Sequence, residues 1–310
     1  MSEAPAGAPP PAGVRRDVQL ARLTTVRTGG SAELFARPAS DEQLVELLRW
    51  AADGNIEVGV VGSGSNLLVA DNGVKGLVLK LDGALAGIEP DGLRLRCGGG
   101  ARLPQIAARA AALGLGGIEF GVSIPGTVGG AVRMNANAYG GELARVLEWV
   151  DVATPDGIER RPPAQLGFGY RRSELARREV VARAEFLLTA AEPARVKELL
   201  ADLRARRKAA QPAGIRTFGS TFKNPDDPRA EGRTAGQLLD AAGCRGLRVG
   251  GARFSPKHAN FVDNDGDAST ADVVALMALG RARVAERFGI TLEPEVQRLG
   301  PVRLPWEAGR

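Results

Sequence analysis

The amino-acid sequence predicts an α+β protein made of two or three structural units. The chain has 310 residues, which is more than one typical domain holds. Hydrophobic residues make up 44% and charged residues 25%, as in chains that bury a core. Short apolar strands alternate with helices, and no internal repeat is visible. A mostly disordered chain and a membrane protein are excluded, because no run approaches the roughly 20 apolar residues that span a bilayer.

Apolar residues at helical spacing predict the helices. The segment 41–52 follows Ser40, whose hydroxyl is expected to cap it. Pro193 begins a helix suited to joining two domains, and Ser269 or Thr270 lies near the start of the last one. The predicted helices are 41–52, 103–113, 193–210, 234–242 and 272–288.

Short apolar runs between these helices predict strands, and the first residues predict a tail. Residues 1 to 16 are rich in Ala, Pro and Gly, so we expect a disordered tail there. The segments 67–69 and 249–262 are expected to be extended. The predicted strands are 57–61, 76–81, 93–97, 147–153, 157–160, 180–188 and 291–300.

Charge and rare residues exclude several functions. Lys plus Arg number 41 and Asp plus Glu 36, a net charge of +5, and the most basic run, Arg204–Lys208, is expected to be a solvated helix face. With only 5% aromatic residues, nucleic-acid binding is rejected. Cys97 and Cys244 cannot form a disulfide framework or a four-cysteine zinc site, and they favour a reducing cytoplasm. The single histidine, His258, excludes a multi-histidine metal site.

A Gly-rich loop follows the predicted strand 57–61. Glycines permit positive φ, so that successive backbone N–H groups can converge on an anion such as phosphate. A Rossmann fingerprint would place its third glycine where Leu67 stands, and no P-loop pattern occurs. Alone, the loop is equally compatible with a phosphate site and with a structural turn. Its residues are Gly62, Ser63, Gly64, Ser65 and Asn66.

A second Gly-rich stretch, GVSIPGTVGGAVRMNANAYG, covers residues 121–140. Its glycines would let the backbone approach a flat ligand closely, and its hydroxyl and amide side chains would supply polar contacts. A buried turn packed against a sheet has the same composition. The residues that this stretch would offer to a cofactor are Ser123, Pro125, Gly126, Thr127, Gly129, Gly130 and Asn135.

Together the two motifs, GSGSNLLVAD and IPGTVGGAVRMNANAYG, resemble the UDP-N-acetylenolpyruvoylglucosamine reductase family, in its shorter type. The resemblance extends over about residues 18–300 and includes TVRTGGSA at 25–32. It implies non-covalent FAD, NADPH as hydride donor, and a two-lobed FAD-binding fold of the vanillyl-alcohol-oxidase/PCMH type with a separate α+β substrate-binding domain. Asn137 departs from the family, which has glycine there. Since Asn tolerates left-handed backbone best after Gly, the loop is expected to survive.

The resemblance also implies a domain division. The tail at 1–16 precedes an FAD-binding region at 17–192, with lobes at about 17–80 and 81–192. A linker helix and substrate-binding domain follow at 193–290. The last strand and tail, 291–310, are expected to return to the FAD-binding region.

The implied reaction reduces the enolpyruvyl ether of UDP-N-acetylglucosamine enolpyruvate to UDP-N-acetylmuramate, for cell-wall synthesis. FGYRRS at 168–173 matches the family's aromatic-x-Tyr-Arg-x-Ser, which assigns Arg171, with Tyr170 beside it, to the substrate carboxylate. A planar guanidinium suits a carboxylate that becomes an enolate. Arg172 is not assigned, and an Arg-Arg pair without the motif is usually surface charge.

The other implied catalytic residues lie towards the C-terminus. FGSTFKNP at 218–225 matches Gly-Ser-x-Phe-Lys-Asn-Pro and assigns Ser220 as proton donor to the enolate, with support from Lys223 and substrate contact from Asn224. Without the resemblance this segment is simply a turn. In LEPEV the glutamate after the proline, Glu295, is assigned to enol stabilisation, and Glu293 is expected to be exposed.

A further stretch, SPKHAN at 255–260, lies where the family approaches its substrate and nicotinamide. Lys257, His258 and Asn260 are therefore candidates for substrate binding, although a lone histidine is more often structural. No metal is expected.

Two other functions stay open. The first is another FAD-dependent oxidoreductase of the same fold, acting on a hydroxy acid or alcohol, and the second is a non-catalytic nucleotide-sugar-binding protein. The presence of Arg171, Ser220 and Glu295 in matching motifs weighs against the second. No apolar stretch follows Arg15-Arg16, so an export signal is not expected. We expect a cytoplasmic monomer whose partners are NADPH and a nucleotide sugar, with no membrane or nucleic acid.

Overall fold

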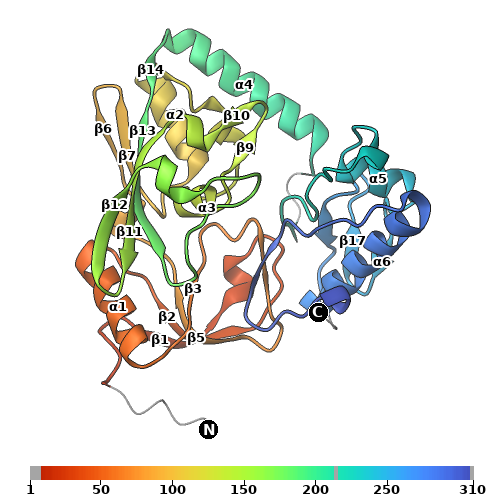
Figure 1. The fold of residues 1–310 in the computed structure, drawn as a ribbon, viewed down its shortest axis with the longest axis horizontal. Coiled ribbons are helices and arrows are strands. Elements are labelled where there is room, and N and C mark those ends of the chain that lie inside the picture. The colour runs from red at the N-terminus through yellow and green to blue at the C-terminus, as the bar shows by residue number, and fades with distance from the viewer. Residues whose placement is uncertain (1–7, 213–215, 308–310) are drawn as a thin grey trace. The chain divides into compact units, whose positions relative to one another are not determined.

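The computed structural model describes residues 8–212 and 216–307, and the chain divides into two compact units (Figure 1). The first unit contains the described residues through Val18, then Glu33–Ser63 and Lys75–Arg207. The second contains Gln19–Ala32, Gly64–Val74 and the described residues from Lys208 onward. Two short N-terminal segments therefore belong to the C-terminal unit. This division differs from the boundaries expected from the sequence.

A four-stranded sheet in the order β1-β2-β5-β3 lies mostly in the first unit. Helix α1 (Asp41–Asp53) packs its buried leucines against this sheet. The predicted N-cap is confirmed, because the Ser40 hydroxyl accepts from the backbone N–H of Gln43. The strands are β1 (Arg15–Gln19), β2 (Ser31–Ala36), β3 (Val58–Val60) and β5 (Val74–Leu79).

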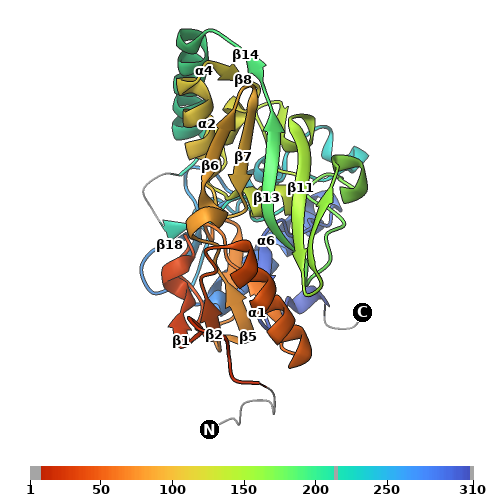
Figure 2. The ribbon, with the colours of Figure 1, turned by 90° about the vertical axis from the view of Figure 1, so that its left-hand side faces the viewer.

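The second sheet of this unit is antiparallel, five-stranded and ordered β12-β11-β13-β7-β6 (Figure 2). One face packs against α2 (Leu103–Ala112) and α3 (Val128–Arg133) around Leu95, Val150 and Phe186. The strands of the first sheet lie within residues 15–79 and those of the second within residues 88–187. The strands are β6 (Ile88–Asp91), β7 (Arg94–Gly98), β11 (Leu147–Thr154), β12 (Gly157–Arg161) and β13 (Val180–Leu187).

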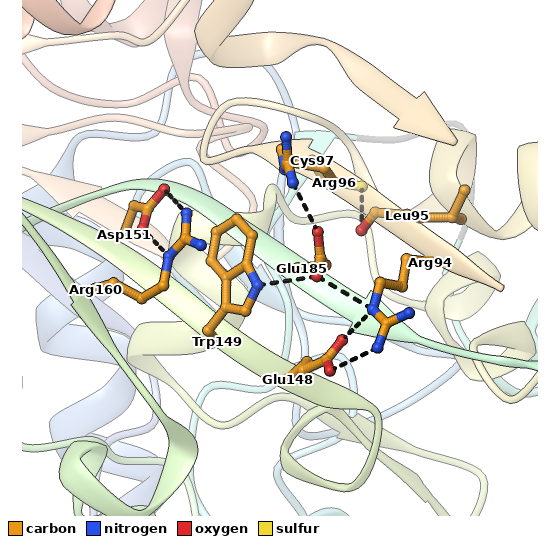
Figure 3. Close-up of polar contacts among 9 residues, drawn as sticks. All are labelled: Arg94, Leu95, Arg96, Cys97, Glu148, Trp149, Asp151, Arg160 and Glu185. Atoms are coloured by element: carbon orange, nitrogen blue, oxygen red, sulfur yellow. Dashed lines mark hydrogen bonds and ion pairs between the residues drawn. The ribbon is translucent and has the colours of Figure 1, made fainter. Parts of the chain in front are cut away.

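Trp149 is the centre of a polar cluster on this sheet (Figure 3). Its ring lies under the guanidinium of Arg160, 3.6 Å from the centroid, and 5.5 Å from that of Arg96. Its Nε1 donates to Glu185 at 2.9 Å, and Arg96 lies 3.3 Å from the same carboxylate. Only 4% of Glu185 is exposed. The cluster therefore supplies the partners that a buried charge requires.

Helix α4 (Pro193–Ala210) contains the boundary between the units. Its buried face packs Val196 and Leu203 with residues of α2, which places most of the helix in the first unit. Arg207 donates to the backbone carbonyl of Ser123 at 2.8 Å. Burial lowers the pKa of Arg207. The prediction that the whole basic run is a solvated face is therefore wrong at this position.

The second unit has its own sheet and core. Its four strands are antiparallel and ordered β15-β18-β17-β16. Helices α5 (Ala235–Ala241) and α6 (Thr270–Phe288) both begin with a capping box, at Thr234 and Ser269. Aromatic residues, among them Phe222 and Phe254, are fully buried in this core. The strands are β15 (Arg216–Thr217), β16 (Arg248–Val249), β17 (Ala252–Phe254) and β18 (Val262–Asn264).

Three paired two-stranded ribbons complete the structure. In the second unit, β4 (Leu67–Val69) pairs in parallel with β19 (Gln297–Leu299). In the first, β9 (Asn137–Ala138) pairs with β10 (Gly141–Glu142), and β8 (Leu115–Gly116) with β14 (Thr189–Ala190). Within the described part of the chain, no helix has the length and apolarity to span a membrane.

Several strand predictions were too long. The segment 249–262 is broken between β17 and β18 by a turn, in which the N–H of Phe261 bonds to the carbonyl of His258. The predicted strand 291–300 retains only β19, because the residues around Pro294 pair instead as a single bridge with Phe222. Proline cannot donate to a ladder, so the pairing ends there.

Asn137 itself does not adopt a left-handed conformation. It is extended in β9, whereas the positive φ angles fall on its neighbours Asn135, at 40°, and Tyr139, at 49°. The expectation that Asn137 would need to replace a left-handed glycine therefore does not apply.

The prediction of a disordered tail through residue 16 is wrong for its C-terminal part. Arg15 and Arg16 begin strand β1, and Val14 packs against the core of the first sheet. The Trp50 side chain donates to the carbonyl of Ala8 at 2.9 Å. Composition concealed this order because the contacts are made with residues far along the chain. Residues 1–7 lie outside the described part.

Truncation should locate the stabilising part of this segment. A chain that begins at Asp17 loses Val14 and the start of β1, and should melt several degrees below the full chain, since about 1 kcal/mol shifts Tm by roughly 2–4 °C at this size. A chain that begins at Gly13 keeps both and is the matched control. Thermal denaturation followed by circular dichroism measures the difference. Equal melting temperatures for the two truncations would contradict a stabilising role of β1.

Candidate active site

The first Gly-rich loop begins in the first unit, where β3 ends. The carbonyl of Gly62 accepts from the Lys80 Nζ at 2.6 Å. A Cβ on Gly62 would come within 2.4 Å of the Thr127 Oγ1, so the two Gly-rich stretches approach closely here and a side chain at Gly62 would force Thr127 to move. Burial lowers the pKa of Lys80, and neighbouring Arg37 and Arg102 act in the same direction. The Lys80 side chain is therefore held beside this loop by its hydrogen bond to Gly62.

The rest of the loop belongs to the second unit. Gly64 has a φ of 65°, and a Cβ there would lie 2.1 Å from the carbonyl oxygen of Leu23. Its own carbonyl accepts from the backbone N–H of Thr25 at 3.0 Å. Residues 23–25 therefore hold the turn at Gly64. A side chain at Gly64 would disturb this packing, so a substitution there would test the turn and not a ligand.

The second Gly-rich stretch is held by the residues that follow β7. The backbone N–H of Val128 donates to Ala101 at 2.9 Å, and that of Gly129 donates to Gly99 at 2.8 Å. Thr127 is the N-cap residue of α3, and Pro125 and Gly126 lie half-buried before it. The stretch is thus fixed by its backbone, which leaves side-chain groups available for another partner.

Three buried polar atoms of the first unit point to that partner. The Ser63 Oγ, Ser123 Oγ and Asn135 Oδ1 are buried and have no hydrogen-bond partner among the residues described. Buried polar atoms are normally satisfied, so an unsatisfied group indicates a ligand or water. Gly130 is exposed, and an added Cβ would meet nothing closer than 3.8 Å. These residues fit a cofactor that offers polar edges and a flat surface.

Alanine at Gly130 should separate cofactor binding from stability. A Cβ at Gly130 enters open space, and alanine in a helix is favoured over glycine by up to about 1 kcal/mol. We expect Gly130→Ala to weaken FAD binding while the cofactor-free protein melts no lower than the parent. In Gly129→Ala, the control, the Cβ would press on the Gly99 carbonyl at 3.2 Å and lower the melting temperature. Flavin titration and thermal denaturation measure both; unchanged FAD affinity in Gly130→Ala would place the cofactor elsewhere.

Arg171 lies in a tight turn of the first unit. Gly169 and Arg172 exchange backbone hydrogen bonds at 3.1 and 3.2 Å across it. The φ of Arg171 is 57°, a left-handed conformation that is costly for a residue with a side chain. The Arg171 guanidinium lies 5.3 Å from the ring centroid of Tyr170, and 48% of Tyr170 is exposed. The backbone is thus strained at a residue that is expected to bind substrate. Strained backbone conformations are often found at functional sites.

In the second unit the backbone places Ser220 near the predicted glutamate. The N–H of Glu295 donates to the carbonyl of Thr221, next to Ser220, at 2.9 Å. Two residues on, the N–H of Lys223 donates to the carbonyl of Glu293 at 2.9 Å. Glu293 is exposed, as predicted, and its carboxylate lies 3.4 Å from the Lys223 ammonium, whereas Glu295 is half-buried. The motifs at 218–225 and 292–296, which are distant in sequence, are thereby brought together.

Asn66 connects the first loop to this pair of motifs. Its Nδ2 donates to the backbone carbonyl of Glu295 at 3.2 Å, and its carbonyl accepts from Gln297 at 3.0 Å. Its Oδ1 and the hydroxyl of the fully buried Thr221 have no hydrogen-bond partner within the described ranges. Asn66 thus holds the backbone on both sides of Val296. Ser65 contributes its carbonyl, which accepts from the N–H of Gly219 at 2.8 Å.

The remaining substrate-binding candidates have partners within the second unit. The Asn260 amide, 3% exposed, accepts from the N–H of Phe222 and donates to its carbonyl, at 2.9 and 2.8 Å. This geometry favours positioning of the Ser220 segment over direct contact. The Asn224 Oδ1 accepts from Ala235 at 3.1 Å, at the start of α5. The Lys257 ammonium donates to the carbonyl of Lys208.

His258 is packed rather than open. Its Nδ1 accepts from the N–H of Asn260 at 3.2 Å, and its ring meets Phe261 edge-on with centroids 4.9 Å apart. A Cβ on Gly236 would lie 2.6 Å from the ring. Burial lowers the pKa of His258, which favours the neutral imidazole. These contacts support the structural interpretation of this histidine.

Two residues next to the candidate site escaped the sequence analysis. Lys80 directly follows β5, and Arg207 lies in the basic run of α4. Only their positions in the fold show that they reach the loops. Neither lies in a motif with a recognisable spacing. Among the residues described, no group of three His, Cys, Asp or Glu side chains is placed to hold a metal ion.

Comparisons with known proteins find similar domains for parts of both units. Residues 32–161 match an FAD binding domain, and residues 211–299 match the C-terminal domain of UDP-N-acetylenolpyruvoylglucosamine reductase. A UDP-N-acetylenolpyruvoylglucosamine reductase of Anaeromyxobacter sp. (strain K) is 47% identical over 92% of this chain and 85% of its own. UDP-N-acetylenolpyruvoylglucosamine reductase 2 of Symbiobacterium thermophilum is 43% identical over 96% and 94%. The crystal structure of UDP-N-acetylenolpyruvylglucosamine reductase from Thermus caldophilus is similar, with a TM-score of 0.80, 36% identity and coverage of 92% and 98%.

Proposed function

Because the chain belongs to the UDP-N-acetylenolpyruvoylglucosamine reductase family, we propose that it reduces UDP-N-acetylglucosamine enolpyruvate to UDP-N-acetylmuramate, a precursor of the bacterial cell wall. It is an oxidoreductase with FAD as cofactor and NADPH as hydride donor. The observation that carries this proposal is the relationship over nearly the whole chain, at 47% identity. The resemblance and the fold class predicted from the sequence are both confirmed.

The residues of the first unit are proposed to hold the cofactor. Ser63, Ser123 and Asn135, whose buried polar atoms lack partners in the described part of the chain, would bind its polar groups. The Lys80 ammonium, which donates to the carbonyl of Gly62, would attract the negatively charged diphosphate of FAD. The chemistry supplied by bound FAD would be the transfer of a hydride from NADPH to the terminal vinyl carbon of the substrate.

Side chains of the protein are proposed to stabilise the developing negative charge and to supply the proton. Arg171 would bind the substrate carboxylate, on which negative charge develops as the enolate forms. The Ser220 hydroxyl would donate the proton to the adjacent carbon, with the Lys223 ammonium stabilising the alkoxide briefly. Glu295 would stabilise the enol. The backbone hydrogen bond from Glu295 to Thr221, the neighbour of Ser220, supports the proposal that Ser220 and Glu295 act on the same substrate.

A spectrum followed by two additions tests the proposal. The purified protein should be yellow and should release FAD on denaturation. NADPH under anaerobic conditions should bleach the flavin absorbance, and the enolpyruvyl nucleotide sugar should restore it. Bleaching without restoration by this substrate would favour another flavin oxidoreductase of the same fold, and no bleaching would favour a binding protein. The monomeric state and the cytoplasmic location stay predictions, and light scattering tests the first.

A further inference from the structure

Arg133, the last residue of α3, uses its side chain to bind the chain segment that follows Arg171. Its Nη1 donates to the carbonyl of Leu175 at 3.1 Å. Its Nη2 donates to the carbonyls of Ala176, at 3.1 Å, and Glu179, at 2.7 Å. A planar guanidinium presents its donors in a fixed fork, so three carbonyl acceptors fix its orientation and theirs. Burial lowers the pKa of Arg133, and the charge of Glu179 opposes this.

The same helix end also holds both sides of the Arg171 turn. The Ser173 hydroxyl donates to the backbone carbonyl of Arg133 at 2.9 Å. On the other side, the Asn135 Nδ2 lies 3.4 Å from the carbonyl of Gly169 and 2.8 Å from the carboxylate of Glu142. The turn between Gly169 and Ser173 is therefore fastened at each end to the residues that close α3.

The turn needs such fastening because its backbone is strained. A left-handed arginine persists only when the surrounding structure fixes the turn, since relaxation would lower its energy. Relaxation would rotate Arg171 away from its present direction. Binding of a carboxylate by two parallel hydrogen bonds is sensitive to such a rotation.

We propose that Arg133 is a positioning residue whose guanidinium sets the direction of Arg171 by clamping the segment 175–179 to the end of α3. This inference rests on the proposed function of Arg171 as the group that binds the substrate carboxylate. It also connects the two tasks of the first unit, because α3 begins in the Gly-rich stretch proposed to hold the cofactor. Loss of Arg133 should therefore affect substrate binding with the cofactor still in place.

Arg133→Met and Arg133→Lys of the FAD-loaded enzyme test this. Arg133→Met should raise the KM for the enolpyruvyl substrate and its Kd, measured from the flavin spectrum, by roughly 10- to 100-fold, as misplaced substrate-binding groups do. FAD content and the rate of flavin reduction by NADPH should stay within about twofold of the parent. Arg133→Lys, which keeps one donor group, should fall between. Arg177→Met is the control, because it removes an exposed arginine from the same segment. It should change neither the KM nor the Kd for the enolpyruvyl substrate.

A double variant distinguishes positioning from a general structural effect. If Arg133 acts through Arg171, Arg133→Met should add little to the Kd once Arg171 is already lysine, because coupled residues are not additive. Full additivity, or an unchanged Kd in Arg133→Met, would overturn the proposal, as would equal losses of FAD and of substrate binding. If Arg133→Met does not fold, the same criteria apply to Arg133→Lys. An unmodified enzyme that is inactive with this substrate would instead refute the proposed function.

Discussion

Ser220→Ala should stop the reaction between its two halves. NADPH should still reduce the flavin at close to the normal rate, because that hydride transfer requires no proton from Ser220. Reoxidation by the enolpyruvyl substrate should slow by roughly 10²–10⁴-fold, the usual contribution of a general acid. Stopped-flow absorbance of the flavin measures each half separately.

Ser220→Cys gives the matched comparison. A thiol at the same position is a stronger acid than a hydroxyl and should restore part of the lost rate. Equal slowing of both halves in Ser220→Ala would indicate that the residue supports the fold of its segment, where its neighbour Thr221 already accepts from Glu295. Normal reoxidation would move the proton donor to another group.

Arg171→Lys should weaken substrate binding and turnover together. A lysine ammonium is a point charge and cannot replace the guanidinium fork. Loss of one hydrogen bond to a charged group costs about 1.5–3 kcal/mol, so kcat/KM should fall by roughly 10- to 100-fold. Steady-state kinetics with varied enolpyruvyl substrate, at saturating NADPH, measures this.

The adjacent arginine is the natural control. Arg172 is exposed, and Arg172→Lys should leave kcat/KM within about twofold of the parent, as surface substitutions usually do. If Arg172→Lys lowered kcat/KM and Arg171→Lys did not, the carboxylate-binding residue would be Arg172 and the motif match would be displaced by one residue. If neither variant changed kcat/KM, the carboxylate would be bound by another cation.

Local signals in the sequence predicted α1, α2, α4, α5, α6 and the order of the motifs, but they missed the short helix α3 in the second Gly-rich stretch. Ser40, Thr234 and Ser269 cap helices as hydroxyls do wherever a helix N-terminus needs an acceptor. The strand at β1 was missed because its order comes from pairing and from distant contacts, such as that of Trp50 with Ala8. Composition describes only what a segment contains and carries no information on such contacts.

The candidate site shows the same limit. Motifs indicated Ser220 and Glu295, and the backbone pairing around Phe222 and Pro294 then explains how they meet. Motifs could not indicate that the Asn260 amide is used up by Phe222, or that Lys80 reaches the first loop. Those facts depend on side-chain direction in the folded chain. The assigned catalytic roles themselves stay predictions until the variants are measured.

The left-handed backbone of Arg171 has a consequence for protein engineering. Glycine is the residue best suited to a φ of 57°, so Arg171→Gly should cost the fold little or even raise the melting temperature, while removing the proposed carboxylate contact. A screen that rewards thermostability alone would therefore tend to select inactive protein at this position. Any stabilised version of this enzyme should be chosen on turnover as well, and Arg171 should be held fixed in the library.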